Sequence, residues 1–143
     1  MSVTSPGVVL HYRRRADNFL RSAVDLETLD RDSYAPTIGL LSVHACIALA
    51  DALLVAAEGP RANAEDHGEA ARRLQALCSA KHFGNTGVKH FEWLLSMKNH
   101  FSYDASVVKD DVCWMAKLKM DQFFVWASRT FPEVAQIPEV NDA

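Results

Sequence analysis

The densest set of chemically capable side chains in this 143-residue chain lies in one short stretch, Met97–Asp104. Lys98 and Ser102 are four residues apart, as are Asn99 and Tyr103, so each pair shares a face if the stretch is helical. One interpretation is a small polar pocket for phosphate or ribose, doubled by dimerisation. The predicted ligand-binding residues are then Lys98, Asn99, Ser102 and Tyr103.

The alternative interpretation of this stretch is structural. Asn99 then satisfies backbone groups where a helix ends, Tyr103 buries its ring, and Lys98 is solvated. Neither interpretation is excluded by the residue types alone.

Histidines and acidic residues elsewhere give weaker signals. His44 lies in an apolar segment and is expected to be a core histidine, with a His44–Asp51 relay as the alternative because the two are seven residues apart. His67 is expected to cap a helix or to be exposed, and His82 and His90 have no matching ligands. Because the chain has neither a Cys-x-x-Cys nor a His-x-x-x-His spacing, we predict no metal site and no cofactor.

Composition is that of one globular domain, residues 1–143, with its core at about 8–131 and a tail at 132–143. The net charge of −3 gives no overall attraction to nucleic acid or to a membrane, and Arg13-Arg14-Arg15 is expected to form a solvated helix face. Three distant cysteines (Cys46, Cys78 and Cys113) predict buried free thiols in a reducing compartment, and therefore a cytoplasmic location without membrane association.

Hydrophobic periodicity predicts helices throughout, with no alternating strand pattern. The expected helices are Val8–Leu29, Pro36–Ala57, one from Asn63 or Asp66 to Ala80, Val88–Met97, and Ala105–Thr130. The second of them is apolar on most of its circumference, which is typical of a central helix. The predicted fold class is all-α, an antiparallel bundle of four long helices with one additional short helix.

Several segments in this order resemble the HEPN superfamily of helical nucleotide-binding domains, over about residues 12–130. These are the first helix around Ala16–Ala23, the small-residue helix Ser42–Leu54, the tripeptide Asp66-His67-Gly68, and Lys98-Asn99-x-x-x-Tyr103. The last lies where active members of the superfamily carry an Arg-x(4–6)-His motif.

The resemblance implies either a metal-independent ribonuclease or an RNA-processing module, with Arg/His pairs brought together across a homodimer. Here Lys98 replaces the arginine and loses its bidentate fork. Tyr103 replaces the histidine, and an ordinary tyrosine pKa of about 10 makes a poor general base at neutral pH. His100 is a further catalytic candidate, although a helix would turn it about 200° away from Lys98.

The resulting prediction is a HEPN-like nucleotide- or RNA-binding domain of a bacterial stress, defence or toxin–antitoxin system, without efficient nuclease activity. One alternative is a metal-independent endoribonuclease that uses Lys98 with Tyr103 or His100. The other is an interaction module, such as the partner subunit of a nucleotidyltransferase.

Overall fold

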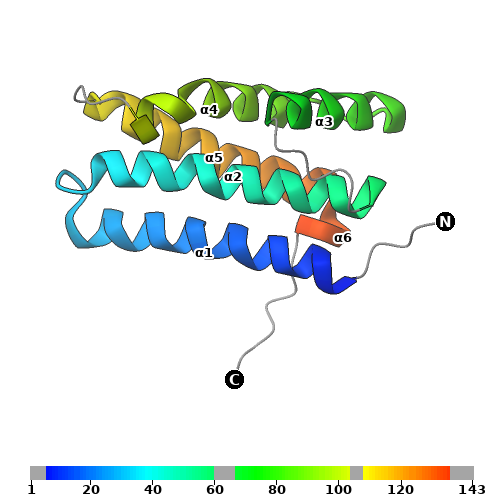
Figure 1. Ribbon diagram of the computed structural model, residues 1–143, viewed down its shortest axis with the longest axis horizontal. Coiled ribbons are helices and arrows are strands. Elements are labelled where there is room, and N and C mark those ends of the chain that lie inside the picture. The colour runs from blue at the N-terminus through cyan, green and yellow to red at the C-terminus, as the bar shows by residue number, and fades with distance from the viewer. Residues whose placement is uncertain (1–5, 60–66, 104–107, 136–143) are drawn as a thin grey trace.

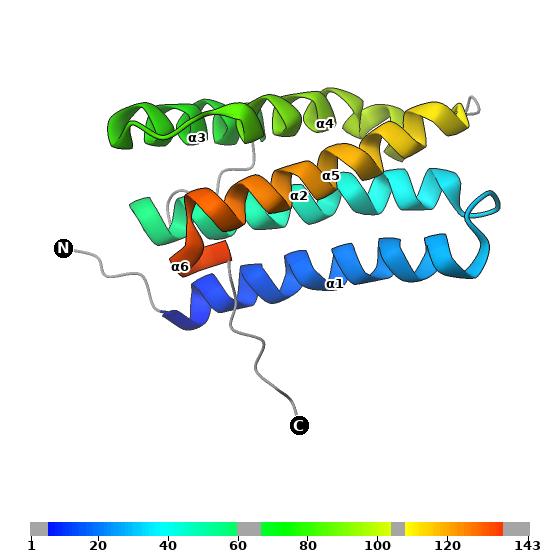
Figure 2. The ribbon, with the colours of Figure 1, turned by 180° about the vertical axis from the view of Figure 1, so that it is seen from behind.

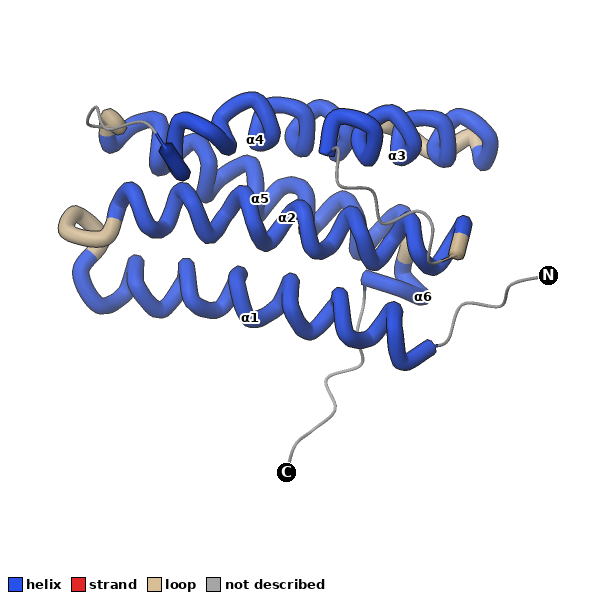
Figure 3. Tube along the Cα trace, in the orientation of Figure 1, coloured by secondary structure: helices blue, strands red, loops and turns tan. Residues whose placement is uncertain are grey.

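The computed structural model describes residues 6–59, 67–103 and 108–135. These ranges hold the helices α1 (Pro6–Asp30), α2 (Ala35–Glu58), α3 (His67–Lys81), α4 (Thr86–Tyr103), α5 (Asp110–Thr130) and α6 (Pro132–Ala135). The described part of the chain contains no strand (Figure 3). The all-α prediction is therefore confirmed.

The helices lie side by side around α2. In Figure 1, α3 and α4 follow one another along the top, α1 lies along the bottom, and α2 runs between them with α5 behind it. The opposite view places α5 nearest to the viewer (Figure 2). The short helix α6 lies between the end of α5 and α1.

Helix α2 forms the centre of the core because its residues are apolar on nearly every side. Its leucines Leu49, Leu53 and Leu54 are at most 1% exposed, and burial of each such side chain contributes roughly 1.5–3 kcal/mol. The Ser42 hydroxyl donates to the Ile38 carbonyl at 2.8 Å, which satisfies a buried polar group without a partner from another helix. By length and hydropathy α2 resembles a membrane span, but 83% of its apolar window is buried inside the protein, as in a core helix.

Helix α4 is longer than predicted, since it continues through Tyr103 instead of ending near Met97. The continuation follows from Phe101, which packs against both clusters of buried residues and lies directly over Gly39 of α2. A Cβ added at Gly39 would lie 2.3 Å from the Phe101 ring, so the glycine leaves the space that the ring fills. The polar stretch is thus the last part of a packed helix.

The last long helix begins later than predicted and ends as predicted. Lys109 is extended (φ −66°, ψ 144°) and α5 begins at Asp110, so residues 108–109 are not helical; residues 105–107 lie outside the described residues. Asp110 and Asp111 lie in its first turn, where negative charge stabilises a helix. Residues 132–135, expected to belong to the tail, form α6, and residues 136–143 lie outside the described residues.

The prediction that Arg13-Arg14-Arg15 form a solvated helix face is wrong for one of the three residues. Arg14 and Arg15 are exposed, but Arg13 is only 6% exposed and its guanidinium lies 3.2 Å from the Asp17 carboxylate. Burial lowers the pKa of Arg13, against the opposing effect of Asp17. The cysteines behave as predicted, because Cys46, Cys78 and Cys113 are buried and free.

Candidate functional site

The predicted site residues occupy the last turns of α4 and do not converge on one pocket. Lys98 and His100 are half-buried, whereas Asn99 and Ser102 are exposed. Tyr103 belongs to the helix, but its side chain lies outside the described residues, so the expected pairing of Lys98 with Tyr103 stays a prediction. Because the helix continues, Lys98 and His100 do point in directions about 200° apart.

The charge of Lys98 instead acts on His44 of α2, together with the charges of two residues from other helices. We call these four basic residues the Lys98 cluster: Arg15 of α1, His44 of α2, His67 of α3 and Lys98 of α4. His44 is the residue on which the other three charges act. Burial lowers the pKa of His44, and the nearby charges of Lys98, His67 and Arg15 lower it further. The His44 ring also packs against Phe19, with the ring centroids 5.6 Å apart.

The other ionisable group beside this cluster is Asp51, two turns after His44 on α2. Its carboxylate is buried, and burial raises its pKa from 3.8 to about 6, although the charge of Arg15 acts in the opposite direction. Arg15 is therefore close to both His44 and Asp51. No hydrogen bond joins His44 to Asp51, so the alternative of a His–Asp relay is not supported.

These side chains can bind an anion and also exchange protons. Lys98 and Arg15 are permanent cations that suit phosphate oxygens. His44 has a pKa below its ordinary value of 6.5, so its imidazole is largely neutral at neutral pH. A neutral imidazole beside a permanent cation is able to accept a proton from a hydroxyl while the cation holds a phosphate.

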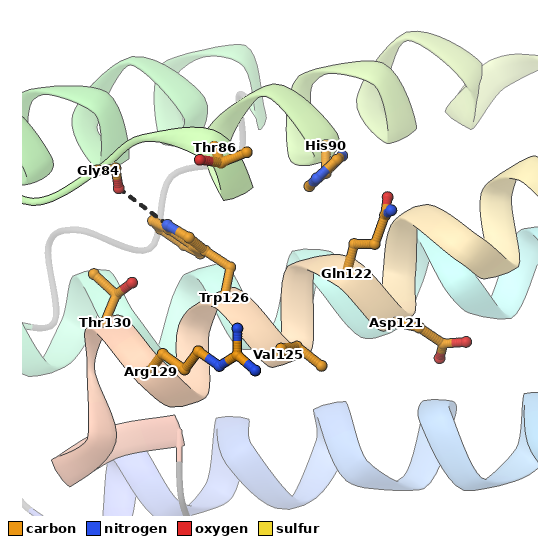
Figure 4. Close-up of a pocket in the computed structure, with 9 residues that line it drawn as sticks. All are labelled: Gly84, Thr86, His90, Asp121, Gln122, Val125, Trp126, Arg129 and Thr130. Carbon is orange, nitrogen blue, oxygen red and sulfur yellow. Dashed lines mark hydrogen bonds between the residues drawn. The ribbon is translucent and has the colours of Figure 1, made fainter.

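A second feature is a groove of about 510 Å³ between α4 and α5 (Figure 4). Trp126 forms part of its wall, stacks on Phe123 and donates its indole N–H to the Gly84 carbonyl at 3.0 Å. Arg129 lies on the α5 side, while His90 points towards the groove from α4. Burial, and then the charge of Lys119, lower the pKa of His90.

The sequence favours the core or a dimer interface for the three tryptophans, Trp93, Trp114 and Trp126, because each has apolar neighbours at helical spacing. Trp93 and Trp114 are partly buried against the core, and Trp114 also receives the Arg31 guanidinium 3.7 Å from its ring centroid. Trp126 is held closely by Gly87, where an added Cβ would lie 2.1 Å from the indole. Among the described residues, no group of three or more His, Cys, Asp or Glu side chains is arranged to hold a metal ion.

Two features of the site were missed by sequence reasoning. His44 was expected to be a core histidine, but it is half-buried and its pKa is lowered by the charge of Lys98, which is far from it in sequence. Arg15 is exposed, as predicted, but the sequence did not indicate that its charge acts on both His44 and Asp51. The only local signal was a histidine and an aspartate two turns apart on an otherwise apolar helix.

The chain matches no protein-family model, no curated protein and no solved structure. The resemblance to HEPN domains therefore stays a prediction, and a function has to be inferred from the side chains themselves.

Proposed function

We propose that the protein binds the phosphates of a nucleotide or of an RNA strand at the Lys98 cluster. The observation that carries the proposal is that the charges of Arg15, His67 and Lys98, from three different helices, all act on the half-buried His44. Burial lowers the pKa of His44, the three nearby charges lower it further, and a bound phosphate would offset those charges. The site therefore favours an anion even though the whole chain has a net charge of −3.

Asp51 gives the proposed site a means of binding a sugar. Its pKa is about 6, so the carboxylate is ionised at neutral pH, and the charge of Arg15 acts on it. The ionised carboxylate is able to accept a hydrogen bond from a ribose hydroxyl beside a bound phosphate. A 2′-hydroxyl contact of this kind distinguishes RNA from DNA. A ribonucleotide fits this combination of cations and one carboxylate.

The fold proposed with this function is a HEPN-like antiparallel four-helix bundle. The side-by-side arrangement of α1, α2 and α5, with α3 and α4 following one another as the fourth member, supports it. The polar stretch at the end of α4 and the position of Lys98 in the cluster are compatible with such a domain.

Binding of a fluorescent single-stranded RNA, followed by anisotropy at several salt concentrations, tests the proposal. We expect Lys98→Ala and Arg15→Ala each to weaken binding at least about fivefold and to reduce the salt dependence by about one phosphate contact. The matched control is Lys89→Ala, because Lys89 is exposed on α4 and points about 180° away from Lys98. Equal affinity of the wild type and both cluster variants would refute the proposed site.

A second candidate function, metal-independent RNA cleavage, is supported by the neutral His44 beside Lys98. In this mechanism His44 takes the proton from a ribose 2′-hydroxyl, and the 2′-oxygen attacks the adjacent phosphorus while Lys98 stabilises the charge on the phosphate. The bond from phosphorus to the 5′-oxygen breaks, the 5′-oxygen takes a proton from water, and a 2′,3′-cyclic phosphate is left. Cleavage of RNA in EDTA that is lost in His44→Ala and retained in Tyr103→Phe would establish it. Absence of cleavage by the wild type at protein concentrations above those of the RNA would leave binding alone.

A further inference from the structure

The outer face of α5 carries a stripe of exposed residues at heptad spacing, which we call the α5 stripe. Its members follow one another at intervals of three and four residues: Asp111, Met115, Leu118, Gln122, Val125 and Arg129. This is the spacing of the contact positions in a two-helix coiled coil. Charged residues occupy its two ends, and the apolar residues lie between them.

The apolar members of the stripe are exposed, and three of them follow one another on the same face. Met115 is 41% exposed, and Leu118 and Val125 are each 48% exposed. The buried side of α5 is separate and consists of Cys113, Ala116, Met120, Phe123 and Ala127. No other helix lies over α5 in the view that faces it (Figure 2). A second apolar stripe on a helix that already packs into the core therefore has no partner within the described residues.

We propose that this stripe is the interface of a homodimer, in which α5 packs antiparallel against α5 of a second copy. A twofold axis midway between Leu118 and Gln122 places Met115 opposite Val125 and Leu118 opposite Gln122. The same axis brings Asp111 opposite Arg129 at both ends of the interface. This proposal does not depend on the proposed phosphate site.

Charge fixes the antiparallel direction. Asp111 lies in the first turn of α5 and Arg129 in its last turn, and among the described residues neither forms an ion pair. An antiparallel partner pairs each aspartate with an arginine, whereas a parallel partner would place like charges together. The helix dipoles also oppose one another in the antiparallel arrangement.

The groove between α4 and α5 provides space for the second copy. Val125 and Arg129 line it together with Trp126 (Figure 4). The proposed axis brings Met115 and Asp111 of the second copy to these residues, so a flexible methionine would pack beside the indole. On the other side of the stripe, Glu27 of α1 contacts Lys117, and Val24, one turn earlier and 40% exposed, adds to the apolar surface.

The mass in solution, measured by light scattering after gel filtration over a range of concentrations, tests the interface. We expect a dimer for the wild type and a monomer for Leu118→Glu, with unchanged helical circular dichroism. The matched control is Leu29→Glu, because Leu29 is 71% exposed on another face and its replacement should leave the dimer intact.

A charge exchange tests the direction of packing. Arg129→Asp and Asp111→Arg should each weaken the dimer about tenfold, because each places two like charges together. The double variant restores opposite charges across the axis and should recover most of the affinity. A monomeric wild type at all concentrations, a Leu118→Glu variant that remains dimeric, or a double variant as weak as the two single ones would overturn the proposal.

Discussion

Replacement of Asp51 by asparagine should stabilise the protein at neutral pH. Burial raises the pKa of this carboxylate from 3.8 to about 6, so the folded state binds its proton more tightly than the unfolded chain does. Each pKa unit corresponds to about 1.4 kcal/mol, so ionised Asp51 lowers the free energy of unfolding by about 3 kcal/mol above pH 6. Asparagine has nearly the same shape and stays neutral, so it removes this penalty.

The gain in stability should vanish in acid. Below a pH of about 3.8 the carboxylate is protonated in both states, and the difference between Asp51→Asn and the wild type should fall below about 1 kcal/mol near pH 4. It should grow between pH 4 and pH 6 and remain constant above that range. Urea unfolding followed by circular dichroism at pH 4, 5, 6, 7 and 8 measures this profile.

The control for this experiment is Asp25→Asn, which neutralises an exposed carboxylate on α1 and should change stability by less than about 0.5 kcal/mol at every pH. Parallel pH profiles for Asp51→Asn and the wild type, or a loss of stability in the variant at pH 8, would refute the reasoning. A gain at pH 8 combined with weakened RNA binding would show that the buried carboxylate is kept for its function.

Three further predictions concern packing and the thiols. Gly39→Ala gains about 1 kcal/mol of helix propensity but forces a Cβ into the Phe101 ring, so we expect a net loss of stability of up to about 2 kcal/mol by urea unfolding. The control Gly84→Ala has open space around the added Cβ and should leave stability nearly unchanged. Trp126→Phe removes the bond to the Gly84 carbonyl and should cost about 1 kcal/mol in the same measurement. Burial and the charge of Asp121 raise the pKa of Cys46, so its thiol should react with a disulfide reagent at pH 7 only as fast as the protein unfolds.

Most of the helices could be predicted because their periodicity is local. The apolar second helix, its proline near the first turn and the Gly59 that ends it were all readable from residue types. The end of α4 could not be predicted in this way, because the run of polar residues after Met97 resembles a loop. Within this run, Phe101 is the residue that packs against the core. That anchor depends on the space above Gly39, which lies on another helix and leaves no local signal.

The site was harder to predict than the fold because its residues come from four helices. Lys98 was selected for the polar residues around it, yet its neighbours in sequence point in several directions from α4. Its electrostatic neighbours in space are His44 and the other members of the cluster. Arg13 shows the same limitation, since three successive arginines look alike in sequence while the helix turns one of them inward against Asp17.

The two proposed surfaces lie on different sides of α2 and should therefore act independently. Cys46 is influenced by the charge of Asp121 on α5, whereas His44, two residues earlier, points about 200° away from it, towards α1, α3 and α4. Dimerisation through α5 would thus leave the Lys98 cluster open on each copy. Leu118→Glu should change the mass without changing the RNA affinity of a short strand that fits one site, and Lys98→Ala should do the opposite. Loss of both properties in either variant would mean that the site is shared between the two copies, and the phosphate-binding residues would then have to be sought near α5.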